Sequence, residues 1–248
     1  MSRWSIPCSN NTVKAVNLFD QPQLPQGILH LNAEESRHVV KVLRKKKGDA
    51  IMLTDGRGFF YEAIINDPDP HHCIFSTRNK VEEPHKNFSI HIAISPTKNA
   101  DRIEWFVEKA VELGIDEITL MACEHTERQH LKLERLEKMA ISAMKQSLKA
   151  RLPIVHPLTD FRNVVESASA TEKYIAHVDN DNPHQLKNFV SPGSTYLVLI
   201  GPEGDFSNEE LTLAATMGFK KVGLGHSRLR TETAGLAACH ILNLANTP

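Results

Sequence analysis

The sequence predicts an α/β protein in which a small β-rich domain precedes a larger domain with a mainly parallel sheet. Two patterns lead to this prediction. Up to about residue 81, short β-rich runs are separated by turn residues, whereas after residue 87 apolar strands alternate with amphipathic helices. We therefore expect one domain over residues 17–83 and a second over residues 84–248, with residues 1–16 as a flexible extension.

The first domain is expected to contain a β-hairpin. Residues 50–67, AIMLTDGRGFFYEAIIND, consist of two β-rich runs that meet across Asp-Gly-Arg-Gly, a sequence typical of a hairpin turn. Residues 71–81 predict one more strand. The polar segment EEPHKN, residues 82–87, is expected to link the two domains.

The second domain is expected to alternate strands and helices, which implies a parallel sheet with helices on both faces. Strands are expected at residues 88–96, 115–122, 153–157, 173–179, 194–200 and 220–225, and helices at 101–114, 133–149, 160–169, 208–218 and 233–246. For the first of these helices, Asp101 and Glu104 are expected to form the N-terminal cap, and Gly114 follows the last turn.

The composition is that of an ordinary globular chain, with 41% hydrophobic and 24% charged residues and a formal net charge of −1. No apolar run approaches the roughly 20 residues that a membrane-spanning helix needs. The four cysteines are scattered without a C-x-x-C pair, and no histidine or cysteine cluster has zinc-ligand spacing. We expect a cytoplasmic protein that holds no metal and no disulfide framework.

Positive charge is concentrated in one short segment. The run RHVVKVLRKKK contains six lysines and arginines and no carboxylate: Arg37, Lys41, Arg44, Lys45, Lys46 and Lys47. Such a run is consistent with a solvated helix end, and equally with a surface that contacts phosphates, because a nucleic-acid backbone attracts clustered cations.

Two glycine-rich segments follow predicted strands in the second domain. The strand YLVLI runs into Gly-Pro-Glu-Gly, residues 201–204, and the strand KKV runs into GLGHSRLR, residues 223–230. Ser207 and Glu210 have the spacing of a capping box, which explains the residues after the first turn but not the turn itself. In α/β sheets, ligands bind where strands end, so these two turns predict a pocket for a small, flat, nucleoside-like ligand, with His177 at the end of a third strand.

Other common nucleotide and hydrolase motifs are missing from the sequence. Arg228 stands where a dinucleotide fingerprint needs its third glycine, and the sequence contains no P-loop and no G-x-S-x-G elbow.

Together, LVLIGPEGDFS and LGHSRLRTETAGLAA resemble motifs of the ribosomal RNA (uracil-N3) methyltransferase family of the SPOUT superfamily. HVVKVLRKKKGD and EKAVELGIDEI are similar to two further motifs of that family, and the four occur in the family's order. The resemblance implies a PUA-like β-barrel domain that binds RNA, followed by a trefoil-knotted α/β domain. It also implies a homodimer that uses S-adenosyl-L-methionine to methylate N3 of a uridine in 16S ribosomal RNA of the small subunit.

The resemblance also implies site residues. The cofactor would be lined by His177, Leu199, Ile200, Gly201, Gly204, Leu224, Gly225 and Leu229. Arg230 would face the reacting groups, where a cation stabilises the anion that develops on a weakly acidic ring nitrogen. Glu203 and Glu232 are candidate bases or positioning groups. The structural explanations, which the sequence favours, are a cap of loop N–H groups for Glu203 and a partner of a helix N-terminal dipole for Glu232.

The sequence departs from the family pattern at two of these motifs. Asp205 stands where the family has a second glycine, and Ser227 replaces an arginine. Three alternatives therefore stay open: an RNA-binding protein whose methyltransferase fold lacks activity, a SPOUT methyltransferase with another RNA target, and an enzyme acting on a small molecule with a nucleotide cofactor.

Overall fold

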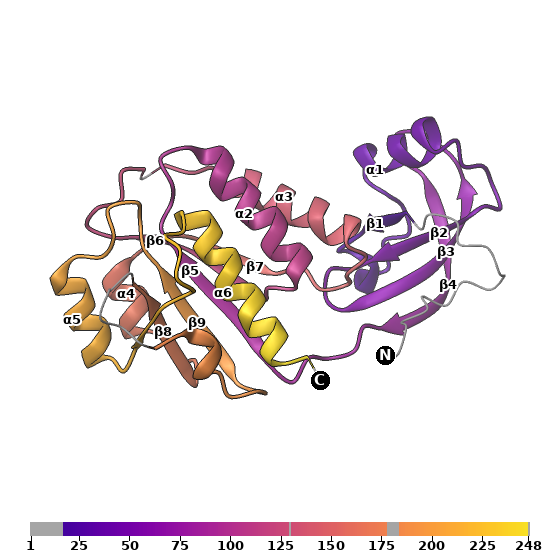
Figure 1. Ribbon diagram of the computed structural model, residues 1–248. Helices are drawn as coiled ribbons and strands as arrows, with labels where there is room; N and C mark the ends of the chain where they lie inside the picture. The colour runs from indigo at the N-terminus through magenta and orange to yellow at the C-terminus, as the bar shows by residue number, and fades with distance from the viewer. Residues whose placement is uncertain (1–16, 129, 178–183, 248) are drawn as a thin grey trace. The chain divides into compact units, whose positions relative to one another are not determined.

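The strands of this protein form two separate sheets, as the computed structural model in Figure 1 shows. The structure describes residues 17–128, 130–177 and 184–247, so the predicted extension over residues 1–16 lies outside the described residues. The chain divides into two compact units, residues 1–82 and residues 83–248, and each unit has its own sheet and its own core.

The N-terminal unit contains a four-stranded sheet in the order β1-β2-β3-β4. Its strands are β1 (Leu18–Asp20), β2 (Ala50–Thr54), β3 (Phe59–Asp67) and β4 (Ile74–Glu82). The predicted hairpin is confirmed, because β2 and β3 pair antiparallel across residues 55–58, and the further strand predicted over 71–81 is β4. The short β1 pairs with β2 in parallel, which the local pattern did not predict.

Short helices connect β1 and β2 in this unit. They are η1 (Leu24–Gln26), α1 (Ala33–Arg37) and η2 (His38–Val42), the last of these a single turn of π-helix. Val39 from η2 is fully buried and packs in the same core as Leu53 of β2 and Phe75 of β4. The helical segment is therefore fixed to the sheet through its apolar face, while its basic residues point outward.

The C-terminal unit contains a six-stranded sheet in the order β10-β8-β9-β5-β6-β7, and every pair of neighbours is parallel. This confirms the predicted parallel sheet. The strands are β5 (Ser89–Ile94), β6 (Glu117–Ala122), β7 (Ile154–Asp160), β8 (Glu172–Ala176), β9 (Thr195–Ile200) and β10 (Lys220–Val222).

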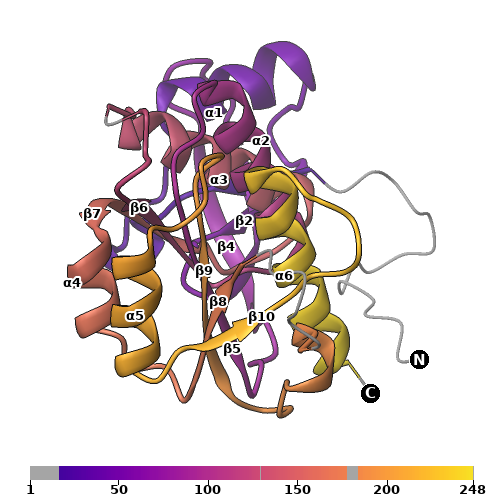
Figure 2. The same cartoon turned by 60° about the vertical axis from the view of Figure 1, so that its left-hand side comes forward.

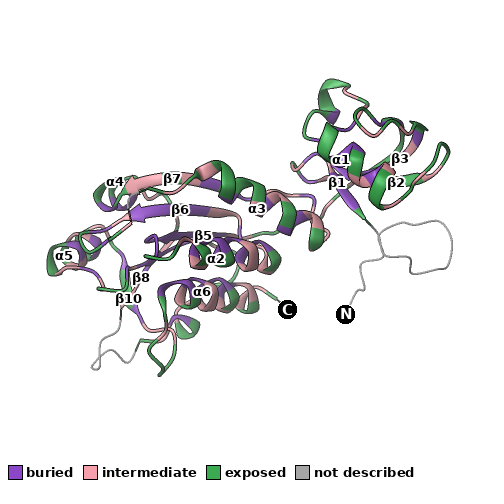
Figure 3. Cartoon of the chain, turned by 90° about the horizontal axis from the view of Figure 1, so that it is seen from above, coloured by how far each residue is buried: buried purple, intermediate pink, exposed green. Residues whose placement is uncertain are grey.

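Helices cover both faces of this sheet, as predicted (Figure 2). One core lies between the sheet and α2 (Ala100–Leu113), α3 (Leu133–Gln146) and α6 (Thr231–Ala245). The other core lies under α4 (Phe161–Glu166) and α5 (Asn208–Thr216), and a 3-10 turn, η3 (Leu186–Asn188), precedes β9. The central strands β5 and β6 are almost wholly buried, whereas the helices expose their outer faces (Figure 3).

Two helix starts test the predicted caps. The capping box at α5 is confirmed, because Ser207 Oγ accepts the N–H of Glu210 and the Glu210 carboxylate accepts the N–H of Ser207. The predicted cap of α2 is wrong. The side chain of Asn99 caps this helix by accepting the N–H of Asp101, and Glu104 is buried and pairs with Arg135 of α3 at 2.7 Å.

The last helix returns to the middle of the sheet. The chain leaves the edge strand β10, yet α6 packs against α2 and against β5. Gly235 permits this, since a Cβ there would lie 2.6 Å from Phe106 Cε2 and 3.0 Å from Ile94 Cδ1. None of the helices in the described ranges has the length and apolarity that crossing a bilayer requires.

Candidate active site

Three neighbouring strands end together at one edge of the C-terminal sheet. In the order β10, β8, β9, all parallel, their carboxyl ends lead into the segments at Leu224 and Gly225, at His177, and at Gly201 to Gly204. The backbone N–H of His177 donates to the carbonyl of Val222 at 3.2 Å, which joins the ends of β8 and β10. The two glycine-rich turns and the histidine that the sequence singled out therefore share this edge, where α/β sheets bind ligands.

The turn after β9 is compact because two glycines permit close contacts. A Cβ on Gly201 would lie 3.0 to 3.3 Å from three ring carbons of Phe206, and a Cβ on Gly204 would lie 3.0 Å from Cβ of His125. The turn closes through a hydrogen bond from the N–H of Asp205 to the carbonyl of Pro202. Glycine is therefore required at these two positions partly because neighbouring side chains pack directly against the backbone.

Asp205 occupies a backbone conformation that favours glycine, with a φ of +63°. Its Oδ1 accepts the N–H of Phe206 at 2.8 Å, and the same oxygen lies 3.1 Å from Nδ1 of His177. A short polar side chain that bonds locally is the usual alternative to glycine in the left-handed region. The departure from the family's glycine thus has a local physical explanation.

The predicted lining residues differ in what they can present to a ligand. Leu199 and Ile200 are buried and pack into the cores on opposite faces of the sheet. Gly225 has a φ of +124°, and apart from its chain neighbours no described residue has an atom within 4 Å of the position its Cβ would take. Its N–H donates to Oε1 of Gln185, while Leu224 and Leu229 are half-buried.

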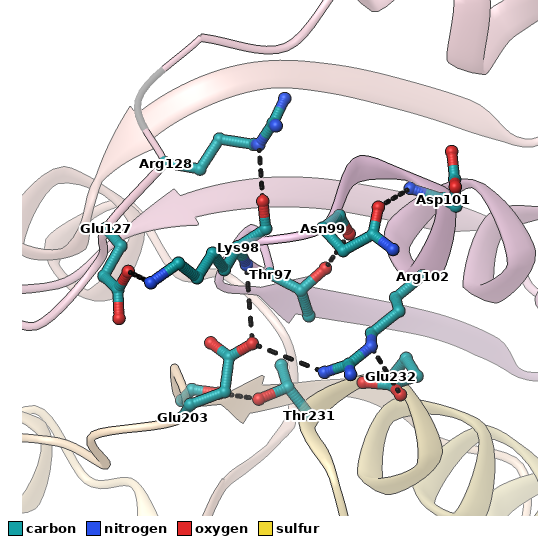
Figure 4. A network of polar contacts seen from close by, with 11 residues as sticks. Thr97, Lys98, Asn99, Asp101, Arg102, Glu127, Arg128, Glu203, Thr231 and Glu232 are labelled. Carbon is teal, nitrogen blue, oxygen red and sulfur yellow. Dashed lines mark hydrogen bonds and ion pairs between the residues drawn. The ribbon is translucent and has the colours of Figure 1, made fainter.

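The N-terminus of α6 joins the same edge. Thr231 Oγ1 donates to the carbonyl of Gly201 at 3.0 Å, so the first turn of α6 adjoins the turn after β9 (Figure 4). Arg230, the residue before α6, has an exposed side chain that makes no hydrogen bond or ion pair with the described residues. The adjacent Glu232 is buried, with its side chain 8% exposed.

Carboxylates and one arginine gather beside that helix start. Glu203 Oε1 accepts the backbone N–H of Lys98 at 3.4 Å, so this carboxylate caps a neighbouring loop, one of its two predicted roles. Oε2 of Glu232 is buried without a hydrogen-bond partner among the described residues. An unsatisfied buried acceptor costs about 1–3 kcal/mol in a folded protein, and more when it is charged.

Sequence reasoning missed Arg102, which lies between these two carboxylates. It comes from the first turn of α2, after β5, and Figure 4 shows it reaching toward Glu203 and Glu232. The loop before α2 also holds Lys98, whose carbonyl accepts the Nε–H of Arg128. The sequence held a partial signal for Arg102, because this residue follows a predicted strand, and residues that follow strands of a parallel sheet lie at its ligand-binding edge.

The basic run lies in the N-terminal unit, at the end of the helical segment and the turn before β2. Its cationic residues are exposed except Lys45, which is half-buried and donates through Nζ to the carbonyl of Ala50: the exposed ones are Arg37, Lys41, Arg44, Lys46 and Lys47. The side chains are thus accessible, as a phosphate-contacting surface requires.

A polar hollow of about 620 Å³ opens at the opposite ends of the strands, beside α4. His91 lies there, hydrogen-bonded to Thr119 at 2.8 Å, and burial lowers the pKa of its imidazole to about 4, with a smaller contribution from His156 and an opposing one from Glu117. The described residues that line this hollow include no lysine or arginine and no glycine, so it lacks the features that the sequence associated with a nucleoside pocket.

Models of known protein families match both parts of the chain. A family model described as an RNA methyltransferase domain matches residues 84–243, and one described as an RNA methyltransferase PUA domain matches residues 31–77. The chain is 27% identical over 213 residues to the ribosomal RNA small subunit methyltransferase E of Rickettsia conorii, covering 85% of this chain and 87% of that protein.

Solved structures are similar over nearly the whole length. A probable rRNA-methyltransferase from Porphyromonas gingivalis is 43% identical, with a TM-score of 0.86 over 92% of this chain and 99% of that one. The ribosomal RNA small subunit methyltransferase E of Neisseria gonorrhoeae, solved bound to S-adenosyl methionine, is 26% identical, with a TM-score of 0.81 over 93% and 98%. The fold class implied by the motifs, a PUA-like domain followed by a SPOUT-type α/β domain with a parallel sheet, is thereby confirmed. The glycine-rich edge and its buried carboxylate thus lie within an RNA methyltransferase domain. The chain belongs to the RNA methyltransferase family in which this domain follows a PUA domain.

Proposed function

We propose that this protein transfers a methyl group from S-adenosyl-L-methionine to N3 of a uridine in 16S ribosomal RNA of the small subunit. The observation that carries the proposal is the shared edge of β10, β8 and β9. Two glycine-rich turns, a histidine and a helix start with buried polar groups meet there, within a chain that belongs to an RNA methyltransferase family. Relatives over most of its length are named ribosomal RNA small subunit methyltransferase E.

The residues at this edge fit the cofactor. The backbone at Gly225 faces open space, which suits a flat adenosine group held by main-chain atoms, and the buried Leu199 and Ile200 would form the base of the pocket. The cofactor carries a sulfonium and an ammonium group, and the carboxylates Glu203 and Glu232 give the edge the opposite charge. His177 would border the pocket with its imidazole oriented by Asp205.

When bound, the cofactor supplies an activated methyl group on sulfur. The tasks left to the protein are to orient the uracil ring and to help N3 lose its proton. Orientation alone can lower the activation barrier by about 7–11 kcal/mol. Arg230 is exposed beside α6, where its guanidinium can stabilise the negative charge that develops on the ring, and Glu203 and Glu232 are the candidates for receiving the proton.

The exposed cations Arg37, Lys41, Arg44, Lys46 and Lys47, together with Lys45, are proposed to contact RNA phosphates. Their test is the salt dependence of RNA binding. Replacing Lys46 and Lys47 by alanine is expected to reduce the slope of log K against log salt by up to about 2, since each lost contact reduces it by nearly 1. The same substitutions should leave cofactor affinity unchanged.

The decisive experiment is a methyl-transfer assay on small ribosomal subunits that lack the modification, followed by mass mapping of the RNA. One new methyl group on N3 of a uridine is the expected product. A methyl group on a guanosine or a ribose 2′-oxygen would contradict the uridine assignment. Calorimetry with S-adenosyl-L-methionine separates the enzyme from an inactive RNA-binding protein, for which no cofactor binding is expected even with RNA present.

We further propose that the protein is a cytoplasmic homodimer, as the family resemblance implies. Sedimentation equilibrium measures the oligomeric state directly, and a monomer at micromolar concentration would exclude the dimer.

A further inference from the structure

Arg102 is the one described cation that lies within ion-pair distance of both candidate carboxylates. Its NH1 nitrogen lies 3.9 Å from Oε1 of Glu203, and its Nε lies 3.8 Å from Oε1 of Glu232 (Figure 4). The three side chains come from three places in the chain, namely α2, the turn after β9 and the first turn of α6. Arg102 therefore links the turn after β9 to the helix start.

Both of these distances are longer than a charged hydrogen bond, which typically spans 2.7–2.9 Å. The side chain of Arg102 is 36% exposed, and it makes no hydrogen bond with the described residues. Its N–H groups are thus held near two carboxylates without being saturated by either. Such an arginine can fix the direction of a carboxylate and still donate to a bound ligand.

The two carboxylates are not equivalent. Glu203 is 40% exposed, and its Oε1 already accepts the N–H of Lys98. Glu232 is 8% exposed, its Oε1 faces Arg102, and its Oε2 is buried with no donor among the described residues. Buried carboxylate oxygens are normally hydrogen-bonded, so an orphaned one at a ligand-binding edge indicates a donor that comes with the ligand.

We propose that Oε2 of Glu232 accepts the proton from the target base, and that Arg102 is the positioning residue that holds Glu232 through Oε1. The proposal rests on the proposed function above. As the proton passes from N3 to Oε2, the electron pair on N3 forms the bond to the methyl carbon, and the electron pair of the methyl–sulfur bond remains on sulfur. The proton on Glu232 is afterwards released to water.

The test compares Glu232→Gln, Arg102→Gln and Arg102→Lys for cofactor binding and for methyl transfer at saturating cofactor and RNA. For Glu232→Gln, the expected cofactor Kd is within about threefold of the wild type, while kcat falls about 10²- to 10⁴-fold, as for loss of a general base. The remaining rate should rise steadily with pH, because hydroxide then takes over removal of the proton. A purely structural defect would not give this pH dependence.

For Arg102→Gln, a kcat loss of about tenfold or more is expected at unchanged KM, with partial recovery in Arg102→Lys. The matched control is Arg135→Gln. Arg135 pairs with Glu104, which lies on α2 like Arg102 but outside the site, so this variant also removes an arginine from a carboxylate. It is expected to keep wild-type kcat. Thermal melting of each variant identifies any that fail to fold, and these are replaced by Glu232→Ala and Arg102→Met.

Two outcomes would overturn the proposal while leaving the function intact. A Glu232→Gln enzyme that loses cofactor affinity more than tenfold but keeps kcat would assign Oε2 to the cofactor's ammonium group. A Glu203→Gln enzyme that loses as much kcat as Glu232→Gln would contradict the choice between the two carboxylates. If the wild type itself binds cofactor but methylates no uridine, the proposed function fails instead.

Discussion

Nδ1 of His177 lies 3.1 Å from Oδ1 of Asp205, and this contact joins the end of β8 to the turn after β9. The same oxygen accepts the N–H of Phe206, so one carboxylate oxygen both stabilises its own left-handed backbone and orients the histidine. His125 also contacts this residue, with Nδ1 3.0 Å from the carbonyl oxygen of Asp205. The position that departs from the family pattern is thus a junction of three loops.

This junction predicts losses of different size for two substitutions of Asp205. Alanine loses the side-chain contacts and keeps the strained φ, so Asp205→Ala should lower the free energy of unfolding by about 1–3 kcal/mol. Asp205→Gly loses the same contacts but relieves the strain, so its loss should be smaller by about 1 kcal/mol. Urea denaturation measures both. Equal losses in the two variants would show that the backbone at this position is not strained.

The capping box of α5 predicts a hierarchy of losses. Ser207→Ala should cost about 1 kcal/mol, as for other N-cap residues. Glu210→Ala should cost more, because this buried carboxylate accepts the N–H of Ser207 and also that of Glu124. Thermal unfolding of both variants checks the order, with Glu209→Ala as the exposed control in the same helical turn. A greater loss for Ser207→Ala would refute the bridging role of Glu210.

Gly235 predicts a steric effect inside α6. Alanine normally favours a helix by about 1 kcal/mol over glycine. Here the added methyl group would meet the ring of Phe106, so Gly235→Ala should instead destabilise the protein by about 1–3 kcal/mol. The double variant Gly235→Ala with Phe106→Leu should recover part of that loss, which a double-mutant cycle in urea measures. A stabilised single variant would mean that α6 shifts away from α2 freely.

His91 predicts a pH dependence of stability. Burial lowers the pKa of its imidazole to about 4 in the folded protein, from 6.5 in an unfolded chain. Between these values the unfolded state binds more protons, so stability is fully present above pH 6.5 and is lost as the pH falls toward 4. Between pH 7.5 and 5.5 the loss from this group should be about 1 kcal/mol.

Urea denaturation at the two pH values, compared between wild type and His91→Gln, isolates this contribution. Glutamine removes the titration and can keep a hydrogen bond to Thr119. The variant should therefore show a pH dependence that is smaller by the same amount. An identical dependence in both proteins would place the titration on other groups.

The order of elements was predictable from the sequence because periodicity records local burial. The strand and helix alternation, the hairpin and the Ser207 capping box all depend on residues close in sequence. The cap of α2 was predicted wrongly because Asn99 and Asp101 compete for the same role within three residues, and geometry decides for Asn99. The sequence pattern alone does not show which side chain reaches the free N–H groups of the helix.

The candidate site was predictable in part. Its glycine-rich turns could be located, because strands that end in paired glycines are unusual. The sequence did not show why both residues must be glycine. Phe206 and His125 pack so closely against Gly201 and Gly204 that a side chain would collide with them. Arg102 could not be associated with Glu232 from the sequence pattern alone. The two residues are far apart along the chain, and they meet only because β5 and β9 are neighbours in the sheet.

The return of α6 to the middle of the sheet also has a consequence in time. Strand β5 is the first of its sheet to be synthesised, whereas α6, which packs on it through Gly235 and Ile94, follows all six strands of that sheet. Until then, a growing chain has an exposed apolar face on its central strands and no Glu232 beside its glycine turns. Contacts so distant in sequence slow folding, and the edge that contains the glycine-rich turns and Glu232 can form only after α6 has been synthesised.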